Sequence, residues 1–250
     1  MLDEFGTTYM TLGDLEQALK AFRDSLAIRE RLVATNSSNT QWQRDLSISY
    51  SKVGDVLVAQ GTLDDALKAY RGALDIIERL VKADAANAGW QRMLSASYNK
   101  VGNVLMAQGK LTEALQAYRD SLAVIERLAG ADPTNAQWQQ DLQYSIGRIG
   151  GIAYAFVLAR NFVAALEAAD QAISLASGQV WLRMNRAHAL MFLGRADEAR
   201  ALYLQYRGTK NVQDNKSWET VILEDFADLR RAGLTHPVME EIERKFNTSG

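Results

Sequence analysis

The chain has 250 residues, of which 23% are charged and 48% hydrophobic, and its formal net charge is −2. These values are ordinary for a folded protein and give no general attraction to nucleic acid or to an anionic membrane, so we expect neither as a partner. The absence of cysteine excludes disulfides and cysteine-ligated metals. No apolar run approaches the roughly 18 residues of a membrane helix, and the opening MLDEFGTTYM lacks a signal-peptide pattern, so the sequence predicts a cytoplasmic protein.

The first 150 residues repeat with a period of 48. Residues 50–61, YSKVGDVLVAQG, match residues 98–109, YNKVGNVLMAQG, at nine of twelve positions, and residues 42–89 match 90–137 at 30 of 48 positions. Trp42, Trp90 and Trp138 recur at the same interval. Self-similarity at a fixed period predicts one structural unit copied along the chain.

Each 48-residue unit predicts two helices. Asn39, Asn87 and Asn135 suit the N-cap of the first helix, which we expect over about 42–60 in the second unit, and Gly61 would end it.

The second helix would open at residues 62–65, TLDD, a start that resembles a capping box. It continues through ALKAYRGALDIIERLVKA, where apolar residues fall at helical spacing.

The period changes after Gly150. Ala165 and Ala199 are 34 residues apart, and so are Arg160 and Gly194 at the turn positions. We therefore predict a repeat domain over 1–208 with about five helix pairs.

Residues 209–250 would form C-terminal capping helices, one ending at Gly233 and one starting at 235–237, followed by a short disordered tail at 247–250. Residues 145–156, SIGRIGGIAYAF, carry three glycines and predict a kink or a break in a helix where the long and short repeats meet. They lack the ending of a phosphate-binding loop.

These residues resemble the tetratricopeptide repeat (TPR) family. The signature of large and small residues is matched in the second unit by Tyr50, Val53, Gly54, Leu57, Gly61, Ala66, Tyr70 and Ala73. The resemblance implies an all-α, right-handed superhelical solenoid of antiparallel helix pairs. It also implies a non-enzymatic protein-protein interaction scaffold that holds a partner peptide or helix in a concave groove. The 48-residue period is similar to that of kinesin light chains and of large multidomain bacterial proteins.

Three positions differ between the matching segments of 50–61 and 98–109. Ser51, Asp55 and Val58 lie within a narrow stripe on a helix at about 100° per residue. Packing residues must recur at every joint, so a stripe that varies is predicted to face solvent or a partner. Neutral drift on a solvated helix face is the alternative.

The resemblance places the first helix of each pair on the inner surface. We therefore predict a partner-binding surface made of Ser51, Lys52, Asp55, Val58, Asn99, Lys100, Asn103, Met106, Asn185 and His188. Side-chain amides and cations of this kind can hydrogen-bond a peptide backbone or its carboxylate.

No catalytic, metal or cofactor site is predicted. The periodic tryptophans are interpreted as core between repeats, and His188 has no cysteine or second nearby histidine to complete a metal site. Met1 aligns with Ser49, in mid-repeat, so a fragment of a longer array is expected. The resemblance then implies an alternative function as a regulatory arm of a protein with an effector domain such as a caspase-like protease or an NTPase. A further alternative is a self-assembly module that forms oligomers through the end at Met1 or through the C-terminal cap.

Overall fold

A computed structural model describes residues 1–248, which form twelve α-helices and no β-strand. The chain divides into two compact units, Met1–Ser145 and Ile146–Gly250, and each is described by itself. The predicted all-α repeat fold is confirmed for the described residues. The sequence predicts that the repeat domain ends at residue 208. This is not the boundary between the two compact units, and it stays a prediction.

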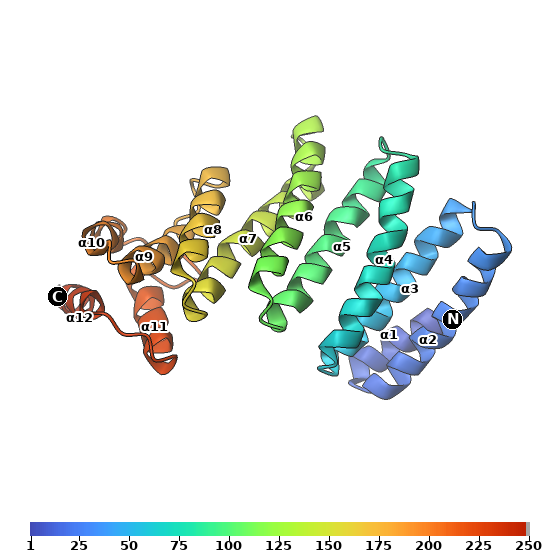
Figure 1. Ribbon diagram of the computed structural model, residues 1–250, viewed down its shortest axis with the longest axis horizontal. Helices are drawn as coiled ribbons and strands as arrows, with labels where there is room; N and C mark the ends of the chain where they lie inside the picture. Colours follow the sequence, from blue (N-terminus) through green and yellow to red (C-terminus); the bar gives the residue numbers. More distant parts are fainter. Residues whose placement is uncertain (249–250) are drawn as a thin grey trace. The chain divides into compact units, whose positions relative to one another are not determined.

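The first unit consists of helix pairs that follow one another in chain order, side by side in Figure 1. Its helices are α1 (Leu2–Leu12), α2 (Leu15–Thr35), α3 (Thr40–Ala59), α4 (Leu63–Ala83), α5 (Ala88–Ala107), α6 (Leu111–Ala131) and the start of α7 (Ala136–Leu158). Each helix contacts the next, as in an array where a unit buries its apolar face only against its neighbours.

The predicted caps of the first helices are confirmed. Asn39 Oδ1 accepts the backbone N–H of Trp42 at 3.1 Å, and Asn87 and Asn135 cap α5 and α7 through the same contact at the same distance. The capping box predicted at residues 62–65 is wrong. Thr62 makes no side-chain cap, because its hydroxyl donates to the Leu57 carbonyl at 3.0 Å instead.

Glycine within α3 lets the two helices of a pair approach closely. A Cβ on Gly54 would lie 2.5 Å from the Tyr70 ring of α4, and the equivalent Gly6 and Gly102 meet Phe22 and Tyr118 at 2.5 and 2.6 Å. These contacts are too short for any side chain, which explains why the repeat has glycine at this position. The core between the pairs is a cluster of buried aliphatic residues from α3 to α6: Leu46, Ile76, Ile77, Leu80, Leu94 and Val124.

The second unit contains the rest of α7 and the shorter helices. These are α8 (Phe162–Leu175), α9 (Leu182–Phe192), α10 (Ala196–Gln205), α11 (Trp218–Arg231) and α12 (Pro237–Asn247). The predicted turn positions Arg160 and Gly194 are both in the left-handed conformation, with φ of 61° and 78°. The two C-terminal helices lie where the sequence predicts them.

The predicted break at 145–156 is wrong, because α7 is one continuous helix through all three glycines. Gly150 has a packing role instead: a Cβ there would lie 2.3 Å from a methyl carbon of Leu182 and 2.7 Å from the Trp181 ring. The predicted disordered tail is wrong for Asn247 and Thr248, which end and cap α12, while 249–250 lie outside the described residues.

Candidate functional site

A cavity of about 610 Å³ runs along α5 in the first unit. It is bounded by α3 on one side and by the start of α7 on the other, and mainly apolar surface lines it. Its lining residues are Arg44, Gly89, Trp90, Arg92, Met93, Ser95, Ala96, Asn99, Lys100, Asn103, Asp141 and Tyr144. We call this space the α5 cavity. Its size and mixed lining are those of a binding site for a small molecule or a short peptide segment.

A second cavity of about 310 Å³ adjoins the first. It is lined by Asp55, Val58, Leu63, Tyr70, Val104 and Ala107 together with Lys100, Asn103 and Tyr144, which also line the α5 cavity. The three shared residues make the two cavities one continuous surface, to which α3, α5 and α7 contribute together with Leu63 and Tyr70 of α4.

Asn99 and Ser95 are the two buried polar residues that line the α5 cavity, and Asn99 is linked to Ser95 by hydrogen bonds. Asn99 Nδ2 donates to Ser145 Oγ at 3.4 Å, and Ser145 in turn is 3.2 Å from Ser121, whose hydroxyl is 2.8 Å from Ser95. This serine chain holds the amide in place. Asn99 Oδ1 is buried and has no hydrogen-bond partner. A buried acceptor without a partner is costly, and this oxygen lies beneath the accessible lining of the cavity.

The charges around the α5 cavity are mostly positive. Arg92 forms an ion pair with Asp141 across the cavity, with 2.6 Å between Nε and Oδ2. Arg44 forms a long ion pair with Asp45, with 3.9 Å between the guanidinium and the carboxylate. Three cations, Arg44, Arg92 and Lys100, line the cavity with one carboxylate, and each cation also has an aspartate partner: Asp45, Asp141 and Asp55 respectively.

Lys100 links successive helix pairs. Its ammonium forms an ion pair with Asp55 of α3 and lies 5.1 Å from the centroid of the Tyr70 ring of α4. Asp55 also accepts a hydrogen bond from the Tyr70 hydroxyl at 2.6 Å. Burial and the adjacent Asp55 carboxylate raise the pKa of Tyr70 well above its usual value. Asp55 is predicted to face solvent or a partner; it lines a cavity, but it also contacts Lys100 of the next repeat.

The structure places half of the predicted surface at the two cavities. Asp55, Val58, Asn99, Lys100 and Asn103 line them. Asn99 is buried rather than open, in contrast to the prediction of an exposed position.

Three predicted residues lie outside the cavity linings. Ser51 and Lys52 are half-buried, and Lys52 pairs with Asp3 at 3.4 Å. Met106 is also half-buried, with its sulfur 3.8 Å from the Tyr118 hydroxyl. Their role in binding stays a prediction.

The expectation that Asn185 and His188 line an open groove is wrong, because both are buried in the second unit. Asn185 Nδ2 donates to the Gly150 carbonyl at 2.9 Å. His188 is fully buried, with Nδ1 2.7 Å from the Tyr203 hydroxyl and Nε2 3.0 Å from Asp225 of α11.

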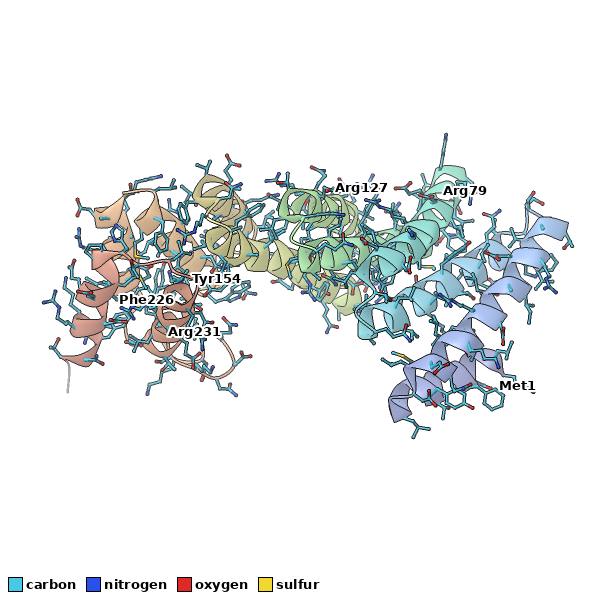
Figure 2. All side chains as sticks on the ribbon, turned by 60° about the horizontal axis from the view of Figure 1, so that its bottom comes forward. Met1, Arg79, Arg127, Tyr154, Phe226 and Arg231 are labelled. Carbon is cyan, nitrogen blue, oxygen red and sulfur yellow. The ribbon has the colours of Figure 1, made fainter. Side chains whose placement is uncertain are left out.

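Aromatic rings surround His188 in the second unit. The centroid of its ring lies 6.0 Å from that of Tyr154 and 5.8 Å from that of Phe226, and Figure 2 labels these two neighbours. This is the environment of a core histidine, and Asp225 and Phe226 of α11 cover it.

Sequence reasoning missed most of the α5 cavity. Trp90 packs against the core between the helix pairs, as the sequence predicts. It also lines the α5 cavity together with Met93. The sequence did contain one signal, because the copies of the repeat differ at the following positions. Asp45, Met93 and Asp141 occupy one equivalent position of successive copies, and Ala96 and Tyr144 occupy another. Within residues 1–248 no group of three or more metal-ligating side chains is present, and none of the helices found there is long and apolar enough to cross a membrane.

Three segments, residues 1–38, 48–84 and 94–135, match the model of the tetratricopeptide repeat family. The first three helix pairs are tetratricopeptide repeats. Repeats of this family typically form protein-protein interaction scaffolds. No curated protein matches the sequence.

Solved structures of low sequence identity share the TPR fold. The TPR-like repeats of a putative kinesin light chain from Podosopora anserina are 14% identical, with a TM-score of 0.54 over 92% of this chain and 95% of that one. BtubC (BKLC) from P. vanneervenii is 16% identical, with a TM-score of 0.53 over 93% of this chain and 89% of that one. Acl4, an assembly chaperone of RpL4, is 14% identical, with a TM-score of 0.53 over 100% and 90%.

Proposed function

We propose that the protein is a non-enzymatic scaffold that binds an extended segment of a partner protein in the α5 cavity. The observation that carries this proposal is the α5 cavity itself, which is large enough for a short peptide segment and combines apolar surface with polar side chains such as Asn103. The N–H groups inside a helix are already paired, whereas an extended segment has free N–H groups to donate. An extended segment can therefore pair with a half-buried side-chain amide of the lining, such as that of Asn103, better than a helix can.

The rest of the lining defines the chemistry of the bound segment. Trp90, Met93 and Tyr144 offer apolar and aromatic surface for one large side chain. Arg44 and Lys100 can contact an acidic side chain beside it, and a charge-assisted contact of this kind is roughly twice as strong as a neutral one. We expect a segment with an aromatic or aliphatic anchor next to aspartate or glutamate.

A selection from a library of short random peptides on the immobilised protein tests the proposal. The blocking variant is Ala96→Arg, because Ala96 is exposed and lines the α5 cavity. The matched control is Ala123→Arg, an exposed alanine of α6 that lines none of the cavities described above. We expect enriched peptides with the stated pattern, bound by the control and lost from the blocking variant.

Equal binding to both variants would show that the peptides bind elsewhere. Circular dichroism and thermal unfolding of both variants establish that they fold alike. A regulatory arm of a larger protein, a self-assembly module and a cytoplasmic location stay predictions from the sequence.

A further inference from the structure

One face of the first helix pair exposes large apolar side chains. Phe5 of α1 is 52% exposed, and Ile28 and Leu32 of α2 are 49% and 40% exposed. We call these three residues the α1/α2 outer face. Exposed apolar residues grouped on one helix pair mark a surface that packs against something.

The same positions are buried in both later copies of the repeat. Moving 48 residues along the chain leads to Val53, Ile76 and Leu80, which are 5%, 4% and 2% exposed. Moving a further 48 residues leads to Val101, Val124 and Leu128, each 5% exposed. The three positions therefore change from buried to exposed only in the first pair.

The preceding helix pair covers the positions equivalent to Ile28 and Leu32 in the later copies. Val124 of α6 belongs to the core cluster that contains Ile76 and Leu80 of α4, so it faces back toward the previous pair. Leu26 and Val33 of α2 pack against the same cluster. The chain thus contains two examples of a helix pair packed against this position of the next pair: α1/α2 against α3/α4, and α3/α4 against α5/α6.

We propose that the α1/α2 outer face is a docking surface for a further helix pair of the same 48-residue repeat. The occupant would present aliphatic residues equivalent to Leu26 and Val33, and it would continue the interface found between the pairs of this unit. A second copy of the protein fits less well, because Leu26 and Val33 are already packed inside each copy.

The charge on this face restricts the occupant. Lys52 of α3 pairs with Asp3, and Lys100 of α5 pairs with Asp55, so each lysine reaches an aspartate on the first helix of the preceding pair. The equivalent residue of α1 is Glu4, whose charge is opposite and whose side chain is 86% exposed. An aspartate at the Asp55 position of the occupant would be repelled by Glu4. The occupant should therefore carry an uncharged or basic residue there, as Asn103 is in the third pair.

The test extends the protein by its own repeat. A copy of residues 37–96 is fused ahead of Met1, which keeps the 48-residue register because Met1 aligns with Ser97. Four fusions combine two changes: Asp55→Asn in the added copy and Glu4→Lys in α1. Thermal unfolding followed by circular dichroism is compared with that of the unextended protein, and Phe5→Glu in the fusion is the control that disrupts the face.

The proposal predicts one cooperative transition at a higher temperature in the fusions, and Phe5→Glu removes the increase. With Glu4 present, Asp55→Asn in the copy raises the midpoint further, and with Glu4→Lys the same change lowers it. Separate unfolding of the added helices would overturn the docking surface, and no reversal by Glu4→Lys would overturn the charge rule. A dimer of the unextended protein that Phe5→Glu dissociates in light scattering would overturn the choice of occupant in favour of a second copy.

Discussion

The ammonium of Lys100 lies 5.1 Å from the centroid of the Tyr70 ring, although the two residues come from neighbouring helix pairs. The arrangement recurs one repeat earlier, where Lys52 lies 5.3 Å from the centroid of the Phe22 ring and 3.4 Å from Asp3. A cation held between a ring and a carboxylate therefore links the second pair to the first and the third pair to the second. This contact also fixes Lys100 at the edge of the α5 cavity.

Replacing Lys100 with Met should lower the free energy of unfolding by about 1 kcal/mol, because a half-buried ion pair and a cation–π contact are lost together. Asp55→Asn should cost less, since asparagine still accepts from the tyrosine, as Asn103 does from Tyr118 at 2.9 Å. Urea unfolding measures both. The control is Lys68→Met, which removes a largely exposed pair with Asp65 and should change little. A larger loss for Asp55→Asn than for Lys100→Met would contradict this view of the linkage.

Gly54→Ala should destabilise the first unit by about 1–3 kcal/mol, because the new Cβ would lie 2.5 Å from the Tyr70 ring. Gly147→Ala is the matched control in α7, where a Cβ meets nothing within 4 Å. That change should stabilise the protein by about 0.5–1 kcal/mol through helix propensity alone. Thermal unfolding of the two variants should therefore shift in opposite directions. A shift in the same direction would mean that the close packing of α3 on α4 is not what requires the glycine.

The repeat pattern was enough to predict the helix pairs, because the spacing of asparagine caps and turn glycines is fixed by backbone geometry. The pattern did not reveal that Asp55 contacts Lys100 of the next repeat. Aspartate and asparagine have nearly the same shape and both accept a hydrogen bond, so Asp55 and Asn103 can replace each other while making the same contact to tyrosine. Variation between copies therefore does not by itself indicate an unoccupied surface.

The pH dependence of stability should include a contribution from Asp3. Burial alone would raise the pKa of Asp3, but hydrogen bonds from Arg29 and Ser25 and the nearby charges of Arg29 and Lys52 together lower it below 3.8. A lowered pKa in the folded state adds stability above the unfolded value, and this stability is lost as the pH falls through the folded value. The difference in unfolding free energy between the protein and Asp3→Asn should thus be constant above about pH 5 and shrink below about pH 4. A difference that grows on acidification would reverse the sign of the linkage.

His188→Ala should cost about 3 kcal/mol or more in stability, because it opens a cavity and leaves Tyr203 and Asp225 without their partner. His236→Asn is the control, since His236 caps α12 through Nδ1 and asparagine is also a good cap. Chemical denaturation of the second unit should therefore separate the two histidines clearly. Similar small losses for both would contradict a core role for His188.

The sequence predicted the two C-terminal helices but not which residues they cover. An ordinary-length repeat register places Asn185 and His188 on the first helix of the last pair, and in an array without a cover they would be exposed. The structure shows that Asp225 and Phe226 of α11 cover His188. Contacts of this kind join residues far apart in the chain, and no period in the sequence relates them.

Site-specific photocrosslinking tests most directly whether the α5 cavity binds a partner segment. A photoreactive side chain is placed at Ala96 in the cavity, and in a second protein at Arg79, an exposed residue of α4 that is labelled in Figure 2. Both proteins are exposed to the peptides selected on the unmodified chain and irradiated. We predict crosslinking at position 96 that excess free peptide suppresses, and none above background at position 79. Equal crosslinking at both positions, or crosslinking at position 79 alone, would contradict the assignment of the α5 cavity as the binding site.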